Sequence, residues 1–293
     1  MNTPVGAPLR AATYLGDNTL TIMRDLVGYL SEATGIDVVV DHMAGRTTTE
    51  ALRHAPTLDL VWMCGCPTAS LISAGRMSHA IVAAPVFAGH GGAVYHSVIV
   101  THAAGPPSLG TALETRLAVN EVESWSGFLG LQAHVERSFP GRWFADQTVT
   151  GSHRASLEAL ADRACDVGSV DVTVWEHTLA ERPEEVAELR VIDRTVDWPA
   201  PPFSLSSNLD TKTRDSLRHA LYALGPADIA SLEGVVPAGL GLYQDLMPGC
   251  DLGGTASRPS RATVLSEVRR RKEAAGTSIP SPLIVEARDA DRT

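Results

Sequence analysis

The chain has 293 residues, of which 44% are hydrophobic, and its 24 Lys and Arg face 34 Asp and Glu for a formal net charge of −10. That length permits two compact units, each with its own core, and the composition is not that of a disordered or fibrous chain. The negative charge disfavours nucleic acid as a partner, because a polyphosphate backbone would be repelled.

Targeting, membrane and metal signals are weak. No stretch approaches the roughly 20 apolar residues that span a bilayer, so no membrane insertion is expected. Residues 1–12 lack the charged start and apolar core of a secretory signal. The sequence as written predicts a cytoplasmic protein, or a periplasmic or lipid-anchored one if a signal has been removed. We interpret Cys64, Cys66, Cys165 and Cys250 as reduced thiols. Metal-ligand spacings are missing, so neither a metal nor a cofactor is expected.

Strand-like and helix-like segments alternate along the chain, which predicts an α/β fold with a largely parallel sheet. In the first part we expect strands at residues 9–15, 36–40, 58–63, 80–86 and 93–101, and helices at residues 18–34 and 47–54. In the second part we expect strands at residues 117–119, 147–149, 167–172 and 190–195, and helices at residues 126–139 and 154–163. A further amphipathic helix is expected at residues 211–224.

Two loops suggest where the chain passes between lobes. Residues 103–107 and the Pro-rich residues 198–202 interrupt the pattern, and two such crossings make a hinge. The predicted division is lobe 1 at residues 1–102 and 203–253, lobe 2 at residues 103–202, and a C-terminal tail or helix at residues 254–293. A ligand site is then expected between the lobes, where strand ends and helix N-termini of both halves face each other.

Two polar turns between a strand and a helix carry the chemistry. Residues 123–127 (Glu-Ser-Trp-Ser-Gly) and residues 151–156 (Gly-Ser-His-Arg-Ala-Ser) both place hydroxyls at the first turn of a helix, where free N–H groups bind anions. The alternative for the first turn is a simple N-cap. The alternative for His153 is an ordinary surface histidine.

Taken together, these turns resemble the phosphate-, phosphite- and phosphonate-binding (PhnD-like) family of ABC-transporter substrate-binding proteins. In that family an Asn, a hydroxyl-rich turn ending in Ser-Gly, a Gly-Ser-His-x-x-Ser turn and a following Asp-Val strand occur in this order. Here they are Asn120, residues 124–127, residues 151–156 and residues 166–171. The resemblance implies a two-lobed, periplasmic-binding-protein-like (type 2) fold with a hinge and an interlobe ligand cleft.

The resemblance also implies which residues bind a small anionic, phosphonate- or phosphate-like ligand. They are Tyr14, Trp62, Gly65, Tyr95, Asn120, Ser124, Trp125, Ser126, Gly127, Ser152, His153 and Asp171. Aromatic residues would wall the substituent side of the ligand, with core packing as their alternative. Trp125 departs from the family, which usually has a small or hydroxylated residue there. Its indole would either shrink the anion pocket or stack on a ring that simple phosphonates lack.

Three functions follow from this sequence. The first is a solute-binding protein that delivers its ligand to an ABC-transporter permease or a sensor. The second is a cytosolic enzyme that reuses the same cleft, with His153 as acid or base, Asp171 or Glu176 as its partner, and Cys64 or Cys66 as nucleophile. No nucleophile elbow, phosphate-binding loop or zinc-protease motif supports the enzyme. The third is an interaction module that uses the Arg-rich tail.

Overall fold

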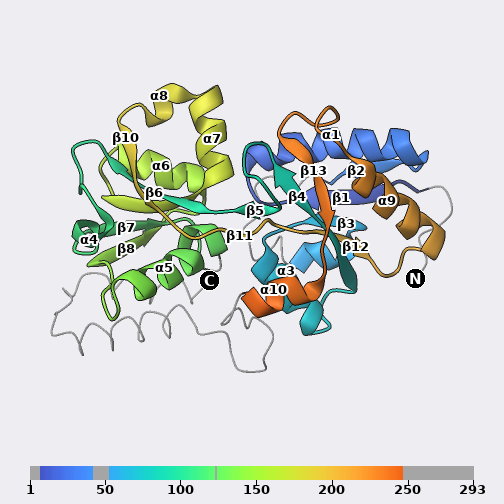
Figure 1. The fold of residues 1–293 in the computed structure, drawn as a ribbon, viewed down its shortest axis with the longest axis horizontal. Coiled ribbons are helices and arrows are strands. Elements are labelled where there is room, and N and C mark those ends of the chain that lie inside the picture. Colours follow the sequence, from blue (N-terminus) through green and yellow to red (C-terminus); the bar gives the residue numbers. More distant parts are fainter. Residues whose placement is uncertain (1–6, 42–52, 123, 247–293) are drawn as a thin grey trace, which may run out of the picture.

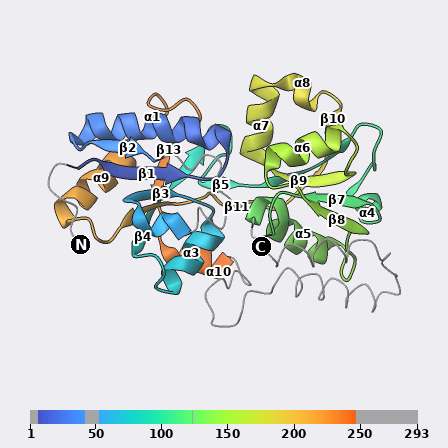
Figure 2. The same ribbon diagram turned by 180° about the vertical axis from the view of Figure 1, so that it is seen from behind.

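The computed structural model describes residues 7–41, 53–122 and 124–246. These residues form two lobes, each a β-sheet with helices on both faces (Figure 1, with the reverse view in Figure 2). The protein is therefore a two-lobed α/β protein, as the sequence predicts. Residues 254–293 and the larger part of the helix expected at residues 47–54 lie outside the described residues.

Lobe 1 is built on a six-stranded mixed sheet of order β13-β4-β12-β3-β1-β2. Its strands are β1 (Leu9–Thr13), β2 (Val38–Val40), β3 (Leu60–Trp62), β4 (His79–Phe87), β12 (Phe203–Ser206) and β13 (Leu232–Pro237). The first three strands are parallel, with Ala11 opposite Leu60, and β12 runs antiparallel to β3 and β4. β12 therefore ties the returning chain into the centre of the lobe 1 sheet.

The helices of lobe 1 lie on both faces of this sheet. They are α1 (Asp17–Thr34), the 3₁₀ turn η1 (Ala55–Thr57), α3 (Gly65–Ser73), α9 (Thr211–Ala223) and α10 (Leu240–Leu246). In both views α1 lies on one face, and α3 and α10 lie together on the other. α1 forms because Met23, Leu26 and Leu30 recur at helical spacing and are fully buried, and it ends at Gly35 in the left-handed conformation.

Lobe 2 has a five-stranded sheet of order β10-β6-β9-β7-β8. Its strands are β6 (Ser97–His102), β7 (Arg116–Val119), β8 (Asp146–Val149), β9 (Val167–Asp171) and β10 (Leu189–Arg194). Its helices are α4 (Leu109–Ala112), the π-helical turn η2 (Trp125–Leu129), which continues into α5 (Gly130–Ser138), and then α6 (His153–Ala161), α7 (Val172–Glu181) and α8 (Pro183–Val186). The strands β7, β8 and β9 are parallel, so the turns that follow them meet at one edge of the sheet.

A two-stranded ribbon connects the lobes. β5 (Val94–Tyr95) pairs antiparallel with β11 (Trp198–Pro199), and Trp198 lies opposite Tyr95. β5 leads from β4 of lobe 1 into β6 of lobe 2, and β11 leads from β10 back to β12. The chain therefore passes between the sheets through two adjacent strands.

One expected strand belongs to the other lobe. The sequence pattern predicts that residues 93–101 belong to lobe 1 and that the chain first crosses at residues 103–107, and the pairing of β6 contradicts both predictions. β6 is hydrogen-bonded between β9 and β10 of lobe 2, so the crossing occurs just before Ser97. The pattern of a buried strand does not reveal which sheet it joins, because pairing is a long-range property. The rest of the domain division remains a prediction.

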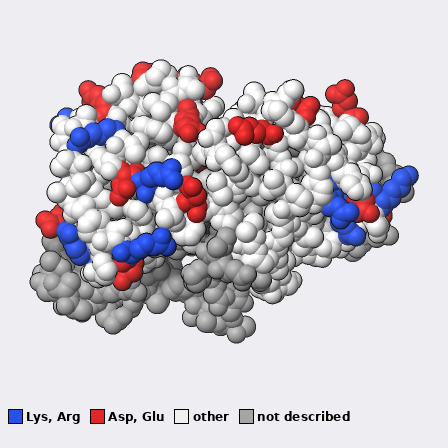
Figure 3. All heavy atoms as spheres, viewed as in Figure 1, with Lys and Arg blue, Asp and Glu red and all other residues white. Residues whose placement is uncertain are grey.

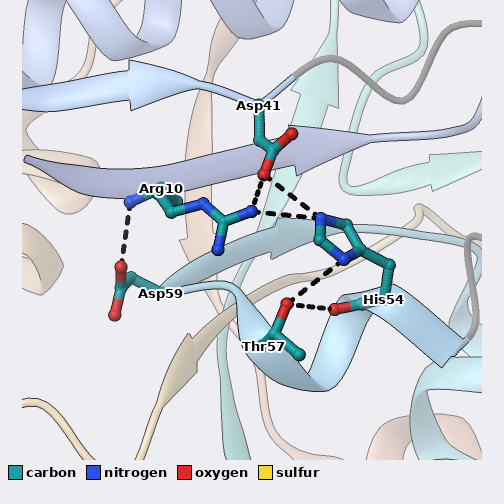
Figure 4. A network of polar contacts seen from close by, with 5 residues as sticks. All are labelled: Arg10, Asp41, His54, Thr57 and Asp59. Atoms are coloured by element: carbon teal, nitrogen blue, oxygen red, sulfur yellow. Dashed lines mark hydrogen bonds and ion pairs between the residues drawn. The ribbon is translucent and has the colours of Figure 1, made fainter.

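A polar network fixes the start of β1 to its neighbours (Figure 4). The Arg10 guanidinium donates to the Asp41 carboxylate, whose Oδ2 also lies 3.1 Å from Nε2 of His54. Burial raises the pKa of Asp41, but hydrogen bonds from His54 and Arg10 outweigh it and the pKa is lowered. The Arg10 backbone N–H donates to Asp59, and the Thr57 hydroxyl donates to the carbonyl of His54 at 2.8 Å. The Thr57 hydroxyl therefore stabilises a turn, and we interpret the whole network as one that stabilises the fold.

Candidate ligand-binding site

The turn between β7 and η2 is stabilised by hydrogen bonds to its own side chains. Oγ of Ser124 accepts a hydrogen bond from the Gly127 N–H at 3.1 Å and another from Nδ2 of Asn120 at 3.0 Å. A Cβ at Gly127 would overlap the Asn120 amide, so the position requires glycine. With Ser124 as the cap, the N–H groups of Trp125 and Ser126 are at the first turn of the helix, where the backbone favours negative charge.

His153 joins this turn to the next helix of lobe 2. It is the first residue of α6, and its Nε2 lies 2.9 Å from Oγ of Ser126 and 3.3 Å from Nδ2 of Asn120. The side chain is 8% exposed. Burial lowers the pKa of His153 to about 4. The imidazole is therefore neutral at pH 7.

Asp171 brings a carboxylate to the same place. It caps α7, and its Oδ1 accepts from the N–H and the hydroxyl of Thr173 at 2.9 and 2.7 Å. Burial raises the pKa of Asp171, while hydrogen bonds from Thr173 and Ser126 act in the opposite direction. The Ser126 hydroxyl thus lies between Asp171 and His153, and the first turns of η2, α6 and α7 meet around it.

Lobe 1 contributes the first turns of α1 and α3. Nδ2 of Asn18 donates to the Thr173 hydroxyl at 3.1 Å, across the boundary between the lobes. Cys64 is the N-cap residue of α3, and its thiol is hydrogen-bonded to the backbone of Trp125 and to the side chain of Tyr95. Burial raises the pKa of Cys64, so the thiol stays protonated at pH 7. The two lobes therefore meet at the polar turns.

The ion pairs of the described Lys and Arg side chains lie outside this group of residues. Among the described residues, the ion pairs and hydrogen bonds of Lys and Arg do not reach Ser126, His153 or Asp171. Figure 3 shows the blue Lys and Arg side chains away from the boundary between the lobes on the visible face. Hydroxyls, backbone N–H groups and helix dipoles are therefore the groups that would hold an anion.

Most of the predicted lobe 2 residues come together. Asn120, Ser124, Ser126, His153 and Asp171 form one hydrogen-bonded group. Gly127 and the backbone of Trp125 complete the turn, Gly65 is the first residue of α3, and Tyr95 contacts Cys64. Their contact with a ligand remains a prediction.

Three predicted residues are placed differently. Ser152 is exposed and caps α6 by accepting from the Ala155 N–H, so its side chain does not join the group. Trp62 is 0% exposed and donates to the carbonyl of Pro201 at 2.9 Å, which is the core-packing alternative. Tyr14 is half-buried and packs against the small cluster of residues beneath β1 and β3.

The residues proposed for an enzyme are brought together only in part. Cys66 is disulfide-bonded, so the expectation of four reduced thiols is wrong and Cys66 is not a free nucleophile. Cys64 and Cys165 are free. Glu176 is paired with His90 at 3.1 Å instead of with His153. Among the described residues no carboxylate is hydrogen-bonded to the His153 ring, so the third group of a nucleophile–base–carboxylate arrangement is missing.

Asn18, Thr173 and Ser169 also contact this group of residues, although their sequence pattern did not predict it. The Ser169 hydroxyl donates to the carbonyl of Ser126 at 2.6 Å and so stabilises the turn. The sequence signal for Asn18 was weak: Gly16 stands just before the expected helix, and its φ of 145° in the structure is one that favours glycine. Within the described residues no group of three or more His, Cys, Asp or Glu side chains could hold a metal ion, and no helix is long and apolar enough to cross a bilayer.

The sequence matches a known family over most of its length. Residues 11–242 match the family described as "ABC transporter, phosphonate, periplasmic substrate-binding protein". The chain belongs to this family and is a solute-binding protein, which agrees with the resemblance found in the polar turns. No curated protein sequence matches the chain.

Solved structures share the fold. PhnD1 from Prochlorococcus marinus in complex with methylphosphonate is 16% identical with a TM-score of 0.68, over 81% of this chain and 94% of that one. A binding protein component of an ABC phosphonate transporter from Pseudomonas aeruginosa is 18% identical with a TM-score of 0.67, over 97% and 99%. A Xanthomonas citri protein bound to ATP is 16% identical with a TM-score of 0.60, over 91% and 99%.

Proposed function

We propose that the chain binds a phosphonate or a related phosphorus oxyanion between its lobes and delivers it to an ABC-transporter permease. The observation that supports this most strongly is the position of the Ser126 hydroxyl, which lies 2.9 Å from His153 and close enough to Asp171 to lower the pKa of that carboxyl. Three helix N-termini of lobe 2 meet there, and helix N-termini bind phosphate-like anions through their free N–H groups. The methylphosphonate bound to the Prochlorococcus protein supports the same ligand class.

Neutral donors suit a ligand that must be released. A phosphonate that is bound by hydroxyls and backbone N–H groups forms no salt bridge that would have to break on release. Its charge-assisted hydrogen bonds are each worth about 1.5–3 kcal/mol. In this proposal lobe 1 completes the site through Cys64 and through Asn18, which already contact lobe 2. Delivery to a permease places the protein in the periplasm, free or lipid-anchored, and the periplasmic family supports that location.

Calorimetric titration of the purified protein with methylphosphonate, inorganic phosphate and methanesulfonate tests the proposal. We expect saturable binding of a phosphorus oxyanion, weakened about 10-fold or more in Ser126→Ala because one charge-assisted hydrogen bond is lost. The matched control is Ser108→Ala, since Ser108 is an exposed cap of α4 in the same lobe. Binding that Ser126→Ala leaves unchanged, or an absence of binding for every phosphorus oxyanion, would contradict the proposal.

A further inference from the structure

Two tryptophans from different parts of the chain meet beside the proposed oxyanion turn. Trp125 belongs to η2 of lobe 2, and Trp198 belongs to β11 of the connecting ribbon. Their ring centroids are 4.8 Å apart and their planes are at 84°, an edge-to-face pair. Trp125 is 4% exposed, so its faces are covered and it is not free to stack on a ligand ring.

Both indole N–H groups are buried, and neither has an acceptor among the residues that the structure describes. A buried donor without an acceptor costs about 1–3 kcal/mol, and native proteins rarely keep one without a reason. Two such donors side by side therefore point to a polar group that binds there.

Gly130 shows where the two donors converge. A Cβ at Gly130 would lie 3.2 Å from Nε1 of Trp125, 3.4 Å from Nε1 of Trp198 and 3.0 Å from the carbonyl oxygen of Trp125. Two donors and one acceptor thus lie close together around the Cα of Gly130, and a side chain at this position would crowd all three. An oxygen atom that accepts twice and donates once matches this arrangement, which is the capacity of a hydroxyl group.

This indole pair is continuous with the proposed oxyanion site. Trp198 lies directly opposite Tyr95 in the β5–β11 ribbon, and residues directly opposite in a ribbon point to the same face. The Tyr95 side chain is hydrogen-bonded to Cys64, which is in turn bonded to the backbone of Trp125. Contacts through Tyr95 and Cys64 therefore connect the polar turn to the indole pair.

We propose that the ligand is a phosphonate whose substituent carries a hydroxyl group, and that the N–H groups of Trp125 and Trp198 bind this hydroxyl. The inference rests on the proposed function of the same site. A plain alkyl substituent leaves both N–H groups unsatisfied, and an ammonium group offers no acceptor. A carboxylate substituent would bring like charge toward Asp171, and His90, which acts on Asp171, is already paired with Glu176. Among these substituents the hydroxyl fits best.

Affinity measurements with matched ligand pairs test the inference. We expect 2-hydroxyethylphosphonate to bind several-fold to about 10-fold more tightly than ethylphosphonate, since each hydrogen bond gained is worth about 0.5–1.5 kcal/mol. Trp198→Phe removes one N–H and keeps a ring, so it should reduce this preference at least two-fold. Trp143→Phe is the matched control, because the Trp143 N–H faces Gln147 elsewhere in lobe 2.

A second variant covers the case in which Trp198→Phe fails to fold. Gly130→Ala keeps both tryptophans but would place a methyl group 3.2 and 3.4 Å from their Nε1 atoms, which crowds both N–H groups, so the preference for the hydroxyl should also fall. Equal affinity for the two ligands in the unmodified protein, or a preference that survives both variants, overturns the inference and leaves the proposed function standing. Failure to bind any phosphonate removes both.

Discussion

Nε2 of His90 lies 3.1 Å from Oε2 of Glu176, and the two residues belong to different lobes. His90 follows β4, in a loop anchored to lobe 1 by a hydrogen bond from the Gly89 N–H to Glu233. Glu176 is on α7, whose first turn also receives the hydrogen bond from Asn18. α7 thus makes both of these contacts with lobe 1, one through Glu176 and one through its first turn.

Glu176→Gln should weaken ligand binding modestly, because it removes the carboxylate that contacts His90 between the lobes. The Glu176 side chain is 55% exposed, and exposed pairs are worth about 0.2–1 kcal/mol, so Kd for a bound phosphonate should rise about 1.5- to 5-fold. The difference should shrink in about 1 M salt, where exposed charges are screened. Glu181→Gln, at an exposed position of the same helix, should leave Kd unchanged. An equal effect of both variants would contradict a specific contact between the lobes.

His153 should make the protein less stable as the pH falls. The folded-state pKa of about 4 is below the usual value of about 6.5. Between these pH values the unfolded chain binds a proton that the folded protein does not, so the stability present above about pH 6.5 decreases as the pH approaches 4. The size is roughly 3 kcal/mol. Urea unfolding at pH 7 and pH 4.5 should show a smaller loss for His153→Gln than for the unmodified protein. Parallel curves would show that burial does not depress this pKa.

Gly127→Ala should destabilise the proposed oxyanion turn. The added methyl group would overlap the Asn120 amide, which bonds both Ser124 and His153, so we expect a loss of about 1–3 kcal/mol in the free energy of unfolding and weaker phosphonate binding. Gly28→Ala is the control, because Gly28 is an exposed interior position of α1 with open space around it. That change should stabilise the protein by up to about 1 kcal/mol. A neutral Gly127→Ala would mean that the turn adapts.

Local patterns predicted much of the fold. The helix expected at residues 18–34 is α1, because its buried positions recur at a period that neighbouring residues alone determine. α7 was missed, since residues 172–175 (Val-Thr-Val-Trp) have a strand-like composition and continue from β9. α3 was missed because its first turn contains the Cys-Gly-Cys-Pro sequence, in which a turn is expected, yet Pro67 is tolerated in a first helical turn.

The site was predictable where one short turn contains several of its residues. Ser124, Ser126 and Gly127 were found together because strand–turn–helix anion sites are local. The contacts of Asn18 and Thr173 were not, since they are 155 residues apart and join different lobes. Trp62 shows a further limit, because a buried aromatic residue at a strand end has the same sequence pattern whether it faces a ligand or the core.

Trp62→Phe separates those two roles. The indole is 0% exposed, packs on Phe203 with ring centroids 5.0 Å apart, and donates to the carbonyl of Pro201. Losing this buried hydrogen bond and leaving a small void should lower the free energy of unfolding by about 1–3 kcal/mol. Kd for a phosphonate, measured on the folded protein, should stay within about two-fold. A large increase in Kd with little loss of stability would place Trp62 at the ligand instead of in the core.

The disulfide at Cys66 should make the protein sensitive to its redox environment. Cys66 lies in the first turn of α3, two residues after the Cys64 thiol that contacts lobe 2. Denatured, unreduced protein prepared under oxidising conditions should therefore contain two fewer reactive thiols than reduced protein. A native disulfide typically contributes about 2–5 kcal/mol, so reduction should lower the melting temperature. Cys165→Ser, which removes a free buried thiol, should leave this difference between oxidised and reduced protein in place. Equal thiol counts would mean that Cys66 is reduced in solution and would weaken the case for an oxidising, extracytoplasmic location.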